Sequence, residues 1–92
     1  MNMSEEDVYE KLRAQLDLQE WPDVYLFKFI VPNSSENLAK ATALFNETSE
    51  ITLHESKTGK FVSVGAKEMM LDVDSIINIY KEASKINGLI AL

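Results

Sequence analysis

The sequence predicts an α+β domain in which four strands form an antiparallel sheet and two helices pack on one face of it. The first observation is the run over 24–31, the most apolar stretch of the 92 residues, which Pro22 and Pro32 bracket at a length that suits a buried strand. The second is a pair of segments with apolar residues at helical spacing, over 33–46 and 72–86. The third is a set of further strand-like segments, over 50–56, 61–66 and 89–92.

A first helix is expected over residues 5–18, outside the sheet and its two helices. Ser4 suits the N-cap, and the acids that follow it favour the first turn. Val8, Leu12 and Leu16 then form a narrow apolar stripe. A helix with so narrow a stripe is marginal alone, so we expect the stripe to dock against the domain or against a second copy of it.

A linker follows this helix, where Trp21-Pro22 holds the chain extended before the first strand. We therefore divide the chain into an N-terminal helix and linker over 1–23 and a main domain over 24–92. The charge follows the same division. Residues 1–23 carry seven acids and two bases, a charge of −5 out of the total of −6, which leaves −1 for the rest.

Both faces of the run over 24–31 are largely apolar. In an extended strand, successive side chains point to opposite faces. One face then holds Tyr25, Phe27, Phe29 and Val31, and the other holds Val24, Leu26, Lys28 and Ile30. Such a strand belongs inside a sheet, where something covers each face.

The second helix is expected to begin with Asn33 as its N-cap. Glu36 follows three residues later, which gives a pair similar to a capping box. Leu38, Ala41 and Phe45 recur at helical spacing and form the side that packs on the sheet.

Turn and capping residues mark the boundaries of the later elements. The segment 57–60 has the length and the glycine of a tight hairpin turn between two strands. Asp72 and Asp74 favour the start of the last helix, where negative charge suits the helix dipole. Asn87-Gly88 supplies a left-handed stop before the final strand.

Beyond the first helix, the expected order is strand, helix, strand, strand, helix, strand. Two interleaved β-α-β units with right-handed crossovers then give the ferredoxin-like arrangement, with both helices on one face. The strands over 24–31 and 61–66 are expected to be central. The opposite, open face is expected to be too apolar to stay fully exposed, because it holds Leu26, Lys28, Ile30, Phe61 and Ser63.

Three segments resemble the YbeD-like proteins, a small bacterial family of unknown function. They are Trp21-Pro22 with Tyr25, Phe27 and Lys28, then the hairpin over 56–64, which is the most specific, and then Tyr80 to Ile86 with the last strand. The resemblance implies a ferredoxin-like fold similar to the ACT-type regulatory domains, which bind amino acids in metabolic enzymes. It adds no catalytic or ligand residues. ACT domains usually carry an Asp and a Gly in the turn after the first strand, and the turn over 31–35 has neither.

The composition argues against several classes of function. The chain has no cysteine, which removes thiol catalysis, disulfides and Cys-based metal sites. It has no clustered basic stripe that would bind nucleic acid. No segment is long and apolar enough to cross a membrane, and the acidic start lacks the layout of a signal peptide, so we expect a cytoplasmic protein.

No residue pattern points to catalysis, a metal ion or a cofactor. His54 is the single histidine, and its neighbour Glu55 points to the other face of the strand, so no acid orients the ring. Gly59-Lys60 lacks the earlier glycine and the following Ser or Thr of a phosphate loop, so we interpret it as turn chemistry. The acids at the start of the last helix suit capping.

Lys28 is the one charge inside the central strand, and it carries the candidate site. An ammonium group buried without a partner is destabilising. It therefore reaches the sheet rim along its apolar stem, past Phe61, or it meets an acid or an anionic ligand. With Phe61 and Ser63 on the neighbouring strand and the same face, the three residues would offer a cation, a ring and a hydroxyl to a ligand.

These observations favour a non-catalytic regulatory or adaptor domain that binds a protein partner or a small metabolite. Two alternatives stay open: an accessory enzyme that uses Lys28 as a buried amine, and a purely structural oligomerisation module. Because the predicted sheet leaves two edges and one face exposed, we also expect a homodimer.

Overall fold

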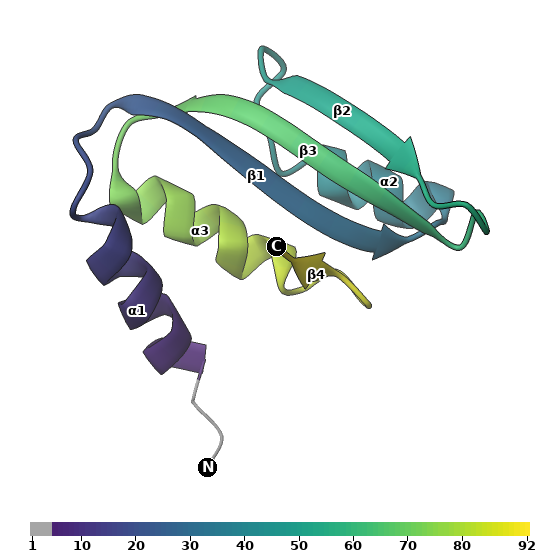
Figure 1. Ribbon diagram of the computed structural model, residues 1–92, viewed down its shortest axis with the longest axis horizontal. Helices are drawn as coiled ribbons and strands as arrows, with labels where there is room; N and C mark the ends of the chain where they lie inside the picture. The colour runs from purple at the N-terminus through teal and green to yellow at the C-terminus, as the bar shows by residue number, and fades with distance from the viewer. Residues whose placement is uncertain (1–4) are drawn as a thin grey trace.

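The computed structural model describes residues 5–92, and within them it contains three helices and four strands (Figure 1). In chain order these are α1 (Glu5–Leu16), β1 (Asp23–Pro32), α2 (Ser35–Thr42), β2 (Glu50–Glu55), β3 (Phe61–Met70), α3 (Val73–Ala83) and β4 (Ile90–Ala91). The strands form one antiparallel sheet in the order β2-β3-β1-β4. The predicted α+β class with a four-stranded antiparallel sheet is confirmed.

The core lies between the sheet and the two helices α2 and α3 (Figure 1). Phe27, Phe29 and Val31 of β1 are each 0% exposed and pack with Val64 of β3 and Ile76 of α3. The side chains on the other side of β1 are exposed or half-buried. The two-residue alternation predicted for the central strand is therefore confirmed.

The strands differ in length from the expected ones. β3 continues to Met70, beyond the predicted end at 66, because it stays paired with β1 as far as the pair Asp23 and Met70. β4 is limited to Ile90–Ala91, because only these two residues pair with β1.

The N-cap of α2 is Ser34, so the prediction of Asn33 is wrong. The Ser34 hydroxyl accepts a hydrogen bond from the backbone N–H of Asn37 at 3.1 Å. Asn33 still continues the hydrogen bonding of β1 with the start of β3, because its backbone N–H donates to the Lys60 carbonyl at 2.9 Å. The chain therefore turns into the helix one residue later than expected.

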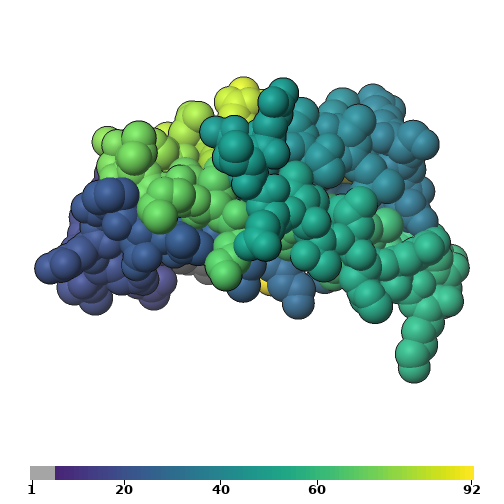
Figure 2. All heavy atoms as spheres, turned by 90° about the horizontal axis from the view of Figure 1, so that it is seen from above, coloured from purple at the N-terminus to yellow at the C-terminus, as the bar shows by residue number. Residues whose placement is uncertain are grey.

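The Asn33 side chain instead ties the β2–β3 hairpin to the end of β1. Its Nδ2 donates to Glu55 Oε1 at 3.0 Å and to the Gly59 carbonyl at 2.9 Å. Gly59 has a φ of +74°, a left-handed conformation that glycine adopts without strain. Figure 2 shows this hairpin at the opposite end of the molecule from α1.

Replacing Ser34 with alanine is expected to lower the free energy of unfolding by about 1 kcal/mol, because an N-cap hydroxyl satisfies a backbone N–H that has no partner inside the helix. Ser35→Ala is the matched control, because Ser35 is the first helical residue and does not cap. Urea unfolding measures both variants. Equal losses for the two would contradict this assignment of the cap.

The start of α3 follows the prediction, but the helix ends at Ala83, before the predicted stop at Asn87-Gly88, and its C-cap is Ser84. Asp72 is the N-cap, and its Oδ1 accepts a hydrogen bond from the backbone N–H of Ser75 at 2.8 Å. Hydrogen bonds from Ser75 hold the pKa of Asp72 below its ordinary value, because they favour the ionised carboxylate. Gly88 has the predicted left-handed conformation, with a φ of +81°, but it lies in the loop between α3 and β4 and does not end the helix.

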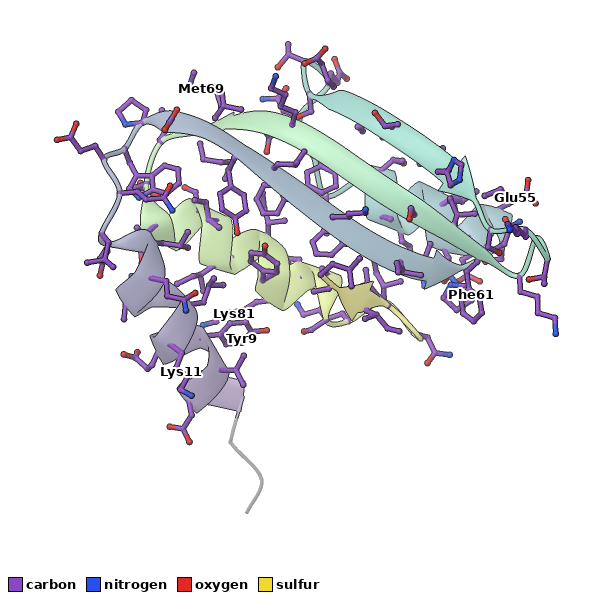
Figure 3. All side chains as sticks on the ribbon, viewed as in Figure 1. Tyr9, Lys11, Glu55, Phe61, Met69 and Lys81 are labelled. Atoms are coloured by element: carbon purple, nitrogen blue, oxygen red, sulfur yellow. The ribbon has the colours of Figure 1, made fainter. Side chains whose placement is uncertain are left out.

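Polar contacts hold α1 against α3. Arg13 forms an ion pair with Asp74 at 2.7 Å, and the Lys81 ammonium lies 5.3 Å from the centre of the Tyr9 ring. Figure 3 shows Tyr9 and Lys81 facing one another across the two helices. The Arg13 side chain is half-buried but that of Asp74 is 80% exposed, so this pair orients α1 more than it stabilises the fold.

The apolar stripe of α1 docks at one end only. Leu16 is 3% exposed and Leu12 is half-buried, which agrees with the expected docking. The Trp21 Nε1–H donates to the Leu16 carbonyl at 2.9 Å and fixes the end of the helix. Val8 is 51% exposed, which corrects the expectation that the whole stripe docks. The predicted N-cap, Ser4, lies outside the described residues.

Candidate functional site

A hollow of about 420 Å³ lies on the open face of the sheet, on the side away from the helices. Three adjacent strands line it. The side chains that face it belong to Glu50, Thr52 and His54 of β2, Ser63 and Lys67 of β3, and Leu26 and Lys28 of β1, with Gly65 of β3 between them. Two of the three predicted site residues, Lys28 and Ser63, therefore share this open-face hollow.

Gly65 forms the floor of the open-face hollow. In the sheet register it lies opposite Lys28 on one side and Thr52 on the other. A Cβ at this position would lie 3.8 Å from the Thr52 carbonyl oxygen, which is an ordinary van der Waals contact. The backbone therefore does not require glycine here. Its effect is to leave space between the side chains of the two flanking strands.

Positive charge gathers at this hollow. Lys67 lies opposite Leu26, so Lys28 and Lys67 are diagonal neighbours on the same face of adjacent strands. Neither lysine forms an ion pair with an acid in the part of the chain that the structure describes. Lys40 and Lys85, in contrast, are paired with acids of their own segments at 3.0 Å. The two unpaired ammonium groups are available to a ligand.

The rest of the lining combines polar and apolar groups. Thr52 and Ser63 supply hydroxyls, and Leu26, which is 67% exposed, supplies an apolar wall. Glu50 lies opposite Lys67 in the register. The hollow therefore offers two cations, two hydroxyls and an apolar surface, with one carboxylate at its edge.

Lys28 is exposed, so the buried amine that the enzyme alternative needs is absent from this structure. The residue sits opposite Gly65, which has no side chain to cover it. Its side chain is therefore open to solvent and to a ligand.

Phe61, the third predicted site residue, lines a neighbouring hollow of about 380 Å³. Phe61 lies opposite Pro32, at the start of β3 and four residues before Gly65, which lies opposite Lys28. Ser63 and His54 border both hollows and join them. Figure 3 shows Phe61 at the hairpin end of the sheet. The structure therefore places Phe61 next to Ser63 and away from Lys28.

The sequence prediction missed the contribution of β2. His54 and Thr52 face the hollow because they lie opposite Ser63 and Gly65 in the β2–β3 register. The length of the hairpin turn could have predicted which residues of β2 and β3 face each other. The Ser56 N–H donates to the Phe61 carbonyl at 2.9 Å and closes a four-residue turn. Counting back from that pair gives the facing residues of both strands.

Other functional features are few within residues 5–92. No group of three side chains that could hold a metal ion gathers there, and no helix in this range is long and apolar enough to span a membrane.

Comparisons of the chain with protein-family models, with curated proteins and with solved structures found no match. The resemblance to the YbeD-like family therefore stays a prediction.

Proposed function

We propose that the main domain has the ferredoxin-like topology and acts as a non-catalytic regulatory or adaptor module. The chain order after α1 is β-α-β-β-α-β, and the sheet order is β2-β3-β1-β4. Two interleaved β-α-β units produce this arrangement, which supports the proposal. The resemblance to the YbeD-like proteins points in the same direction.

The ligand that fits the open-face hollow is a small organic anion, either a carboxylate or a phosphate ester with an apolar group. The pair Lys28 and Lys67 carries this proposal, because both lysines border the same hollow and neither forms an ion pair with an acid within residues 5–92, although Glu50 lies opposite Lys67, so an anion can lie between the two ammonium groups. Hydrogen bonds from an ammonium group to an oxyanion are stronger than neutral ones. The exposed Leu26 side chain can contact the apolar part of the ligand.

The open shape of the hollow limits the affinity. Most of the ligand keeps its contact with water, so the attraction comes mainly from the two lysines. Interactions between exposed charges are screened by salt. We therefore expect the affinity to fall as the salt concentration rises.

Lys28→Met is expected to weaken the binding of phenyl phosphate by roughly 1.5–3 kcal/mol, the range for a hydrogen bond to a charged group. The substitution keeps the apolar stem and removes the ammonium group. Lys57→Met, on the hairpin turn outside the hollow, is the matched control and is expected to bind like the wild type. Isothermal titration calorimetry at low salt measures all three proteins. Equal binding by wild type and Lys28→Met would contradict the proposed site.

The non-catalytic role is tested by a separate experiment. Pyruvate and borohydride trap a lysine that forms a Schiff base with a carbonyl compound. Because Lys28 is exposed, we expect no adduct on it by mass spectrometry. A stoichiometric adduct on Lys28 would favour the enzyme alternative instead.

A further inference from the structure

β2 is an edge strand with its outer side free. It is last in the sheet order, and no other strand within residues 5–92 pairs with its outer edge (Figure 1). All six of its residues are exposed, including Ile51 and Leu53 on the side that faces the helices. Soluble proteins usually protect such an edge with lysine, proline or a bulge. The strand Glu50–Glu55 contains neither lysine nor proline.

The hydrogen bonds of the hairpin show which backbone groups of β2 point outward. The Ser56 N–H donates to the Phe61 carbonyl, so Ser56 directs its backbone groups toward β3. In an antiparallel ladder this direction alternates along the strand. Thr52 and His54 therefore also bond to β3. Ile51 and Leu53 present their N–H and C=O groups to the free edge.

We propose that two copies of this chain pair antiparallel through β2, about a two-fold axis at Thr52, and form a continuous eight-stranded sheet. The five residues from Glu50 to His54 are self-complementary in this register. Ile51 lies opposite the partner's Leu53, and the outward backbone groups of these two positions bond to one another. On the open face, Thr52 meets the partner's Thr52, and Glu50 meets the partner's His54.

Each of these cross-strand pairs is favourable. An apolar pair covers side chains that are 37% and 50% exposed in the single copy. Threonine pairs also stabilise neighbouring strands, and the N–H of a histidine ring can donate a hydrogen bond to a carboxylate. The pairs follow from the order of residues in β2, Glu-Ile-Thr-Leu-His-Glu.

One competing symmetric register has its axis at Leu53 and is less favourable. It places Ile51 opposite the partner's Glu55, which leaves a charged group against an apolar one. It also places Glu50 opposite the partner's Ser56, so the acid has no basic partner. The Thr52 register avoids both mismatches, and it brings the partner's His54 to the edge of the open-face hollow beside Glu50.

A single cysteine tests the position of the axis, because the natural chain has none. In the proposed register the two Thr52 residues form a non-hydrogen-bonded pair, whose Cα atoms lie about 4.5 Å apart, within the reach of a disulfide. Thr52→Cys is expected to form a covalent dimer quickly under mild oxidation. His54→Cys is the matched control on the same face. In the proposed register it lies opposite the partner's Glu50, so the two introduced cysteines at position 54 are too far apart to form a disulfide. Equal rates of cross-linking for the two variants would overturn the proposal.

Sedimentation equilibrium tests the association itself on the unmodified chain. We expect the wild type to dimerise reversibly with rising concentration, and Leu53→Lys to stay monomeric where the wild type is dimeric. Leu18→Lys is the control, because Leu18 is 87% exposed and lies outside β2. A wild type that stays monomeric, or a Leu53→Lys variant that dimerises equally well, would also overturn the proposal.

Discussion

Phe27→Ala is expected to lower the free energy of unfolding by about 3–5 kcal/mol, the range for removing a buried aromatic ring from a core. Phe27 is 0% exposed. Its ring centre lies 4.7 Å from that of Tyr25, 5.3 Å from that of Phe45 and 5.5 Å from that of Tyr80. Removing it leaves a cavity among rings from β1, from α3 and from the segment after α2, which cannot all close on it.

The neighbouring residue supplies the control. Leu26→Ala is expected to change the stability by less than about 0.5 kcal/mol, as exposed positions usually do, because Leu26 is 67% exposed on the open face. Urea unfolding followed by far-UV circular dichroism measures both variants. Losses of similar size would mean that the two faces of β1 are assigned the wrong way round.

Gly88→Ala is expected to lower the free energy of unfolding by about 2 kcal/mol or more. Gly88 has a φ of +81°, and a left-handed backbone is about 1–2 kcal/mol unfavourable for a residue with a Cβ. The added Cβ would also lie 2.7 Å from Cγ of Pro32, so the chain must shift at the entry to β4.

Gly65→Ala is the matched glycine control. Its added Cβ meets nothing closer than 3.8 Å among the neighbours of the site, and alanine suits a strand better than glycine does. We expect thermal unfolding to show a loss for Gly88→Ala and no loss for Gly65→Ala. If Gly65→Ala lost as much stability as Gly88→Ala, the described backbone geometry at these two glycines would be contradicted.

The architecture could be predicted from the sequence because the spacing of apolar residues along a strand or helix indicates which of its sides is buried. Phe27 and Phe29 alternate with Leu26 and Lys28, and this alternation separates the core from the open face. Helix boundaries were harder to predict. Asn33 and Ser34 are both good caps, and the choice between them depends on the Asn33 hydrogen bond to Lys60, which joins residues far apart in the chain.

The candidate site was predicted only in part, because it depends on register between strands. The face of Lys28, Phe61 and Ser63 follows from local alternation. Their spacing depends on how β1 and β3 align, and that alignment places Gly65, and not Phe61, opposite Lys28. Core packing sets this long-range register, and no single segment of sequence specifies it.

The most direct test of the central claim, that the open-face hollow is the binding surface, is a ¹⁵N–¹H correlation spectrum recorded during titration with phenyl phosphate. The amides of Lys28, Gly65 and Lys67 are expected to shift together, with a single affinity that weakens in added salt. A second hollow is lined by α1, α3 and the end of the chain, and it includes Leu12, Tyr80 and Leu89. Shifts confined to that second hollow would contradict the claim, and so would no shifts at all.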